Sequence, residues 1–181
     1  MAGEAWKVLS KLELFDGSPW LRVWAETVQL PGGRVIDGFY SLEAPDYAVV
    51  FAAVSDYVVV QRSYKHGPRR VGLHLPAGYV EPGEDPLDAA KRELREETGY
   101  EADRWTPLGV FTSDGNRGAG RAHVFRADGA RRVAAPASDD LEEAETLLVT
   151  RPELLAALLR GEVPVLSSAA TIALAACVPT S

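Results

Sequence analysis

The stretch LPAGYVEPGEDPLDAAKRELREETGY, residues 75–100, crowds acidic side chains into a short segment at regular spacings. Like charges one helical turn apart repel each other, so this crowding needs a reason. Asp85 is a favoured helix N-cap, Pro86 suits the first helical position, and Gly99 is typical of the left-handed residue that ends a helix. The segment therefore predicts a helix over residues 86–98. An apolar stripe on this helix predicts that it packs on the core, and the stripe consists of Leu87, Ala90 and Leu94.

A second face of the predicted helix gathers carboxylates. Glu93, Glu96 and Glu97 fall at positions i, i+3 and i+4, so their side chains converge. Such a face is usually only a solvated charged surface. Three carboxylates with one obvious cationic partner, Arg92, can instead form a hard oxygen site for Mg²⁺ or Mn²⁺. A bound divalent cation would relieve the repulsion between them.

The spacing of these residues also matches a known pattern. Gly78, Glu84 and the run Arg92-Glu93-Leu94-Arg95-Glu96-Glu97-Thr98-Gly99-Tyr100 resemble the Nudix box at each of its seven fixed positions. This resemblance implies a hydrolase that depends on Mg²⁺, with Mn²⁺ as the alternative metal, and that cleaves a nucleoside diphosphate linked to another moiety. It also implies an α/β/α sandwich in which the box forms a loop, a helix and a loop.

The resemblance further implies a role for each residue of the box. Glu93 and Glu97 would be the principal metal ligands, and Glu96 would assist them. The carbonyl oxygen of Ala77 would be a further ligand, and Arg92 would orient the glutamates. Structural roles as a tight turn, a loop anchor and a helix stop would fall to Gly78, Glu84 and Gly99.

The rest of the chain reads as an α+β fold with a mixed β-sheet. Strand-like runs broken at Asp16-Gly17 and at Pro31-Gly32-Gly33 predict N-terminal antiparallel strands. Two apolar runs around Ser55-Asp56 predict a hairpin that is buried on both faces. We expect an N-terminal strand extension over residues 1–42 and a Nudix hydrolase domain over residues 43–181.

The C-terminal half predicts further strands and two helices. The runs WTPLGVFTS, RAHVFRA and TLLV read as strands, with DGNRGAG as a glycine-rich loop between the first two. The segment RPELLAALLRG has Pro152 in its first turn and Gly161 at its end, as a helix should. A final helix is expected through SSAATIALAA.

The order of these segments is similar to that of the ADP-ribose pyrophosphatase group. ADP-ribose, cleaved to AMP and ribose 5-phosphate, is therefore the favoured substrate. The candidates for contacts with adenine, ribose or phosphate are Arg62, Tyr64, Arg117 and Arg121, for which a solvated arginine or an exposed loop is the alternative. One departure stands out, because Asp114 replaces the proline expected in the loop after the box.

The resemblance also bears on assembly. In that group the N-terminal strands often form a homodimer and help to bind the substrate of the partner subunit. The aromatic residues that could do so here are Trp20, Trp24, Phe39 and Tyr40, although aromatic residues in strands are more often part of the core. We expect a homodimer.

Hydrolysis also needs a group that removes a proton from the attacking water. In the ADP-ribose pyrophosphatase group a carboxylate from a loop after the box lies near this water, and the loop SDDLEEAE is its counterpart. Its position before the run TLLV favours Glu142, with Asp140 and Glu143 as neighbours. A solvated acidic connection is the alternative for each of them.

Composition narrows the class of protein. The net charge is −7 and the sequence pI is about 5.0, so DNA or RNA would be repelled. The single cysteine, Cys177, fits a reducing cytoplasm. The N-terminus lacks the apolar core of a secretory signal, and the run AATIALAACV is too short to cross a bilayer. We expect a cytoplasmic protein with no nucleic-acid partner and no membrane partner.

Two other readings remain open at this level. The chain could hydrolyse another sugar nucleotide or a dinucleoside polyphosphate. It could also be a Nudix-fold module that senses a nucleotide without cleaving it. The complete set of Glu93, Glu96 and Glu97 favours an enzyme, since a sensor need not retain all three.

Overall fold

The computed structural model describes residues 3–137 and 143–178. The chain forms two compact units. The first takes in the described residues up to Asp46 together with Thr112–Arg121. The second takes in Tyr47–Phe111 and the described residues from Ala122 onward. The segment Thr112–Arg121 thus groups with the N-terminal strands, although it lies far from them in the sequence.

The first unit is built on a three-stranded antiparallel meander. Its strands are β1 (Lys7–Gly17), β2 (Leu21–Gln29) and β3 (Val35–Glu43). The first turn is closed by Asp16, whose Oδ1 accepts a hydrogen bond from the Ser18 N–H at 2.9 Å. The second turn is closed between Leu30 and Arg34. Both predicted N-terminal hairpins are confirmed.

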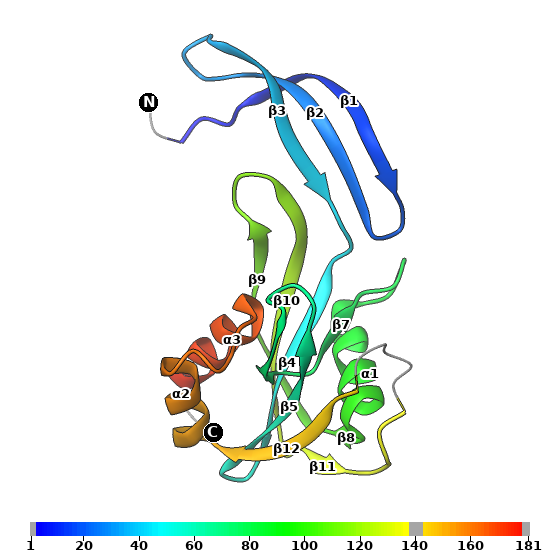
Figure 1. Ribbon diagram of the computed structural model, residues 1–181, viewed down its shortest axis with the longest axis vertical. Helices are drawn as coiled ribbons and strands as arrows, with labels where there is room; N and C mark the ends of the chain where they lie inside the picture. The colour runs from blue at the N-terminus through cyan, green and yellow to red at the C-terminus, as the bar shows by residue number, and fades with distance from the viewer. Residues whose placement is uncertain (1–2, 138–142, 179–181) are drawn as a thin grey trace. The chain divides into compact units, whose positions relative to one another are not determined.

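The second unit contains a mixed sheet in the order β10-β4-β5-β12, shown in Figure 1. Its strands are β4 (Tyr47–Val54), β5 (Tyr57–Lys65), β10 (Gly118–Asp128, from Ala122 on) and β12 (Glu145–Thr150). The β10–β4 pair is parallel, whereas β4–β5 and β5–β12 are antiparallel. Strand β9 (Arg104–Asp114) also pairs with β10, and β8 (Tyr100–Glu101) forms a short ribbon with β11 (Arg131–Arg132).

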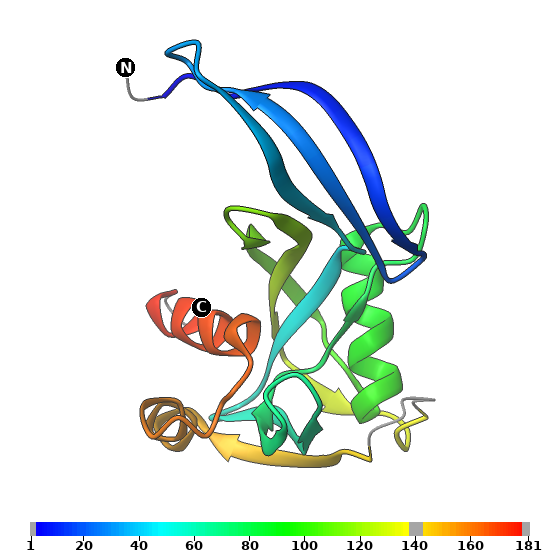
Figure 2. The ribbon, with the colours of Figure 1, turned by 45° about the horizontal axis from the view of Figure 1, so that its top comes forward.

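Helices cover both faces of this sheet. Helix α1 (Pro86–Thr98) lies on one face, and α2 (Arg151–Leu159) and α3 (Leu166–Cys177) lie on the other, as Figures 1 and 2 show. Alternate residues of β4 explain the arrangement, because side chains along a strand point to opposite faces. Ala48, Val50 and Ala52 pack in the cluster that contains Leu94 of α1. The cluster on the other face takes the intervening residues of β4, which are Val49, Phe51 and Ala53.

These layers confirm the predicted α+β fold, with an α/β/α sandwich and N-terminal antiparallel strands. The predicted helix over residues 86–98 is also confirmed. The Asp85 carboxylate caps it by accepting from the Leu87 N–H at 2.9 Å, and Gly99 ends it at φ +75°. Thr150 and Glu153 form a reciprocal capping box at the start of α2. Among the described residues, no helix combines the length and the apolarity that a bilayer crossing requires.

One stretch of chain changes its partner strand in the middle of the sheet. Strand β6 (Arg70–His74) pairs with β5, and strand β7 (Ala77–Tyr79), three residues further on, pairs with β4. The crossing is made by Leu75 and Pro76, where the Val50 N–H donates to the Pro76 carbonyl at 2.9 Å. This crossing places Ala77 and Gly78 next to α1, since β7 and α1 are in contact.

The structure corrects one expectation for the first unit. The run DGNRGAG was predicted to be a loop, but β10 begins at Gly118. The glycines serve close backbone approach, because a Cβ at Gly118 would lie 2.9 Å from the Leu42 carbonyl oxygen. At Gly120 a Cβ would lie 2.4 Å from the Pro45 carbonyl oxygen. Glycine content alone suggested a loop, whereas here it permits tight packing of a strand.

Candidate metal and hydrolase site

Arg92 is the centre of a network that holds the acidic segment together. Its Nε and Nη2 each donate to one carboxylate oxygen of Glu84 at 3.0 Å, which is a bidentate pair. Nη2 also donates to the Tyr79 carbonyl oxygen at 2.9 Å. These hydrogen bonds from Arg92 lower the pKa of Glu84, and the same pair raises the pKa of Arg92. Arg92 therefore ties the loop before α1 to the helix and to β7.

The same guanidinium orients two of the predicted metal ligands. Nη1 of Arg92 donates to Glu93 Oε1 at 2.7 Å and to Glu96 Oε2 at 3.3 Å. The Glu93 side chain is 13% exposed, whereas that of Glu96 is 48% exposed. Glu93 is therefore held close to the protein and Glu96 reaches toward solvent. This arrangement fits a principal ligand and an assisting one.

The Glu93 carboxylate packs directly against the backbone of Gly78. A Cβ at position 78 would lie 2.0 Å from Glu93 Cδ and 2.1 Å from its Oε1, so any side chain would occupy the space of the carboxylate. The glycine of the box is thus required by the close approach of an acidic side chain to the backbone. A turn was the role that the sequence suggested, but Gly78 lies in the middle of β7.

Glu97, one helical turn after Glu93 on α1, contacts the same strand at Ala77, the residue before Gly78. Its Oε2 accepts a hydrogen bond from the Ala77 N–H at 2.9 Å, and Glu97 is 7% exposed. A buried carboxylate is costly unless charged or polar partners satisfy it, and the Ala77 N–H is one such partner. Ala77 and Gly78 therefore each contact one carboxylate, and the two carboxylates come from successive turns of α1.

The donor set fits a divalent cation. Among the described residues, no three Asp, Glu, His or Cys side chains gather closely enough to hold a metal ion by themselves. Mg²⁺ commonly takes only one or two carboxylates and completes its shell with water and substrate phosphates. Glu93 and Glu97, which both lie against β7, supply such a pair. Carboxylate and carbonyl oxygens are the ligands that Mg²⁺ and Mn²⁺ prefer.

A recess opens beside Glu96. Its volume is about 450 Å³, within the range of ligand pockets, and its lining residues are Arg92, Arg95, Glu96, Ala134, Ala135 and Ala137. The alanines belong to a segment that runs back along α1, since the Ala137 N–H donates to the Glu96 carbonyl oxygen at 2.8 Å. The same segment donates to the Gly99 carbonyl oxygen from Val133 at 2.8 Å.

The predicted acidic residues follow this segment. Glu142 and Asp140 lie outside the described residues. Glu143 is described and is exposed, just before β12. Ala137, which is hydrogen-bonded to α1, is the last described residue before this loop. The chain is next described at Glu143, two residues before the start of β12. Glu142 as the acting acid stays a prediction.

The two candidates on β5 occupy the face of the sheet away from α1. Val58 and Val60 of this strand pack in the cluster with α2 and α3. Arg62 and Tyr64 follow them at two-residue spacing, so their side chains leave the strand on that same face. Arg62 and Tyr64 thus do not lie on the face of the sheet that is covered by α1, the helix of Glu93 and Glu97.

The remaining candidates belong to the first unit. Arg121 forms an ion pair with Asp46 at 2.7 Å, which raises the pKa of Arg121. The Asp114 Oδ1 accepts from the N–H groups of Asn116 and Arg117, both at 2.9 Å. Asp114 therefore holds the turn between β9 and β10, a task that proline cannot perform with its side chain. The roles of Arg117 and Arg121 toward phosphate stay predictions.

The fold, the bidentate Arg92–Glu84 pair and the two carboxylates of α1 that lie against β7 define a class of protein. A NUDIX domain matches residues 42–166, which is more than half of the chain. The protein therefore belongs to the Nudix family, and the resemblance of its box is confirmed.

Named relatives lie within this family. An ADP-ribose pyrophosphatase of Bacillus subtilis is 29% identical over 122 residues, covering 67% of this chain and 65% of that protein. An ADP-ribose pyrophosphatase of Mycobacterium tuberculosis is 32% identical over 145 residues, covering 76% and 68%. A crystal structure of an ADP compounds hydrolase superposes with a TM-score of 0.81 at 18% identity, covering 96% of this chain and 93% of that one, which shows the same fold.

Gly78→Ala tests the seat of Glu93. The three atoms nearest to the new Cβ all belong to the end of the flexible Glu93 side chain, so the free energy of unfolding should change by less than about 1 kcal/mol. The displaced carboxylate should weaken Mn²⁺ binding by about tenfold or more, measured by titration calorimetry. Gly67→Ala, where a Cβ would meet nothing within 4 Å, is the control. Unchanged Mn²⁺ affinity in Gly78→Ala would remove Glu93 from the ligand set.

Proposed function

We propose that this protein is a metal-dependent hydrolase that cleaves the pyrophosphate of a nucleoside diphosphate derivative, with ADP-ribose as its substrate. The products would be AMP and ribose 5-phosphate. The observation that carries the proposal is the pair of carboxylates, Glu93 and Glu97, held against Gly78 and Ala77 of β7. Its relatives from Bacillus and Mycobacterium, both ADP-ribose pyrophosphatases, support the choice of substrate.

Each residue of the site would have a separate role in binding the metal ion or in positioning its ligands. A divalent cation, when bound, would neutralise charge on the pyrophosphate oxygens and lower the pKa of a bound water. Glu93 and Glu97 would hold it, with the Ala77 carbonyl oxygen as a further ligand and Glu96 assisting from the solvent side. Arg92 keeps Glu93 and Glu96 in place through its hydrogen bonds to both. The recess beside Glu96 offers room for one half of the substrate.

We propose a second substrate class as an alternative, because the names of the relatives give different substrates. A CMP-5'-(N-acetyl-N-hydroxy-3-aminopropyl)phosphonate hydrolase of Streptomyces rubellomurinus is 32% identical over 123 residues, covering 66% of this chain and 58% of that protein. Asp114 departs from the proline of the ADP-ribose enzymes, and here it organises the β9–β10 turn. Another nucleoside diphosphate derivative is therefore the alternative substrate.

Glu97→Gln tests the metal-dependent reaction. The amide can still accept from the Ala77 N–H, so the protein should stay folded, but it loses the anionic ligand. We expect hydrolysis of ADP-ribose with Mg²⁺ or Mn²⁺ to fall by about a hundredfold or more, measured as AMP release. The same assay on a panel of nucleoside diphosphate derivatives ranks the substrates. Full turnover in excess chelator, or full activity of the variant, would contradict the proposal.

We further propose Glu142 as the general base. Glu142→Gln should lower kcat by about a hundredfold and leave KM nearly unchanged, because the residue would act on the water and not on substrate binding. Asp140→Asn and Glu143→Gln are the matched neighbours in steady-state kinetics. A loss confined to one of these neighbours moves the assignment to it. Three silent substitutions would assign the step to Glu96 or to a metal-bound hydroxide.

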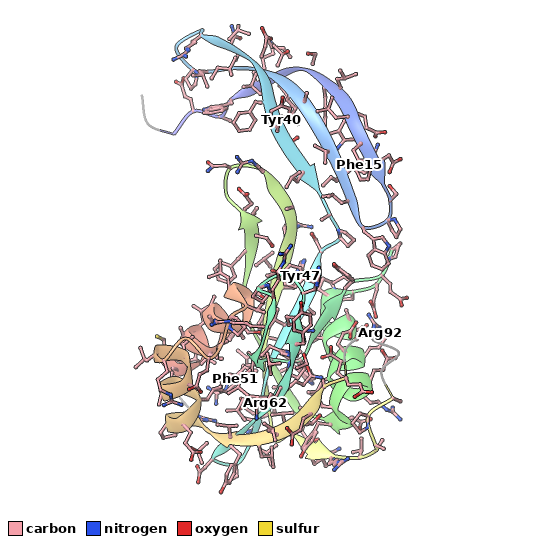
Figure 3. All side chains as sticks on the ribbon, viewed as in Figure 1. Phe15, Tyr40, Tyr47, Phe51, Arg62 and Arg92 are labelled. Atoms are coloured by element: carbon pink, nitrogen blue, oxygen red, sulfur yellow. The ribbon has the colours of Figure 1, made fainter. Side chains whose placement is uncertain are left out.

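A homodimer through the first unit is the proposed assembly. Cross-strand pairing puts Leu12, Ala25 and Tyr40 in one row on one face of the meander. Leu12 is 65% exposed and Tyr40 is 55% exposed, and Figure 3 labels Tyr40 together with Phe15, which is also exposed. Contiguous exposed apolar surface is typical of interaction sites, which supports the proposed dimer. The opposite face carries ion pairs and hydrogen bonds among Lys11, Glu13, Arg22, Glu26, Ser41 and Glu43.

Light scattering at micromolar concentration tests the dimer. We expect a mass of twice the 19.5 kDa of one chain. Leu12→Glu should shift the protein toward monomer, because it places a charge in the apolar row. Lys11→Gln, on the polar face, should leave the mass unchanged. A monomer mass for the unsubstituted protein would exclude an obligate dimer.

A further inference from the structure

The crossing from β6 to β7 makes a hydrogen bond to α3. At Leu75 the strand has left β5 and has not yet joined β4. The Leu75 N–H donates instead to Ser168 Oγ of α3 at 3.1 Å. Leu75 is 1% exposed and Ser168 is 2% exposed, so water cannot replace the serine as acceptor. A buried backbone N–H of this kind must find a partner within the protein.

Two further contacts involve the link, and the first joins His74 Nδ1 to the Leu75 carbonyl oxygen at 3.4 Å. Pro76 has no N–H to donate, and its carbonyl oxygen accepts from the Val50 N–H at 2.9 Å. The bond to Ser168 on one side and the bond from Val50 on the other thus hold the link between the two strands. Immediately after this link the Ala77 N–H reaches Glu97 and Gly78 seats Glu93. A shift at Leu75 would therefore be passed directly to both carboxylates.

We propose that Ser168 is a positioning residue for the glutamates that bind the metal ion, acting through the backbone of residues 75–78. The proposal rests on the proposed metal-dependent function. Ser168 belongs to α3 on the face of the sheet opposite to α1, so it acts on the site from behind the sheet. Groups that orient metal ligands in this way commonly change metal affinity when they are removed.

If Ser168 only helped α3 to pack, loss of another buried hydroxyl from α3 should have the same effect. Thr171 provides this control. Thr171 lies one turn further along α3, is fully buried, and donates its hydroxyl to the Ser167 carbonyl oxygen at 2.7 Å. Its hydroxyl serves the helix itself and makes no bond to the β6–β7 link. Thr171→Val therefore removes a buried hydroxyl from the same helix at nearly constant volume, without touching the link.

The test compares full-length Ser168→Ala and Thr171→Val with the unsubstituted protein. Mn²⁺ affinity is measured by calorimetry, and the exchange rate of the Ala77 amide proton is measured by NMR without metal. Ser168→Ala should bind Mn²⁺ about tenfold more weakly and exchange the Ala77 amide proton faster. Thr171→Val should retain both values at a temperature where it is folded. Ser168→Thr, which keeps the hydroxyl, should restore most of the affinity.

Two results would overturn the proposal. One is a Ser168→Ala protein with unchanged Mn²⁺ affinity and unchanged Ala77 exchange, and the other is an equal loss in Thr171→Val. If Ser168→Ala does not fold, the same measurements on Ser168→Cys, a weaker acceptor of similar size, decide the question. An unsubstituted protein that binds no Mn²⁺ would refute the proposed function, and Ala77 exchange would then still test the link.

Discussion

The crowding of carboxylates around α1 is the constraint on which the rest of the site depends. Without a cation between them, Glu84, Glu93 and Glu96 would repel one another, and this repulsion would push the loop before α1 away from the helix. Arg92 resolves this with one planar group that reaches all three and the Tyr79 carbonyl oxygen. Lysine could not replace it, because a single ammonium group lacks the fork that binds Glu84 bidentately.

Local signals in the sequence predicted the helices and most strands for identifiable reasons. Asp85, Pro86 and Gly99 each act on the backbone next to them, so the bounds of α1 could be read from the residues alone. The same holds for the buried β4–β5 hairpin, whose uninterrupted apolar runs require cover on both faces. The convergence of Glu93 and Glu97 also follows from helical spacing, which is a property of one element.

Features that depend on two distant elements could not be read in this way. The seat of Glu93 on Gly78 requires β7 to pass under α1, and no local pattern states that. The alternation along β5 places Arg62 and Tyr64 on the α2 and α3 face, and their contact with substrate stays a prediction. The run DGNRGAG looked flexible, yet its glycines admit the backbone of neighbouring segments. Ser168 gave no signal at all, since serine in a small-residue helix is ordinary.

The bond between Leu75 and Ser168 also fixes the order in which the molecule can be completed. The two residues are 93 positions apart, and the acceptor belongs to the last helix of the described chain. During synthesis α1 emerges from the ribosome long before α3 does. Until α3 docks, the Leu75 N–H lacks its acceptor, and the link into β7 lacks the bond that ties it to the face of the sheet opposite α1. A nascent chain can thus hold every residue of the Nudix box and still have no finished site.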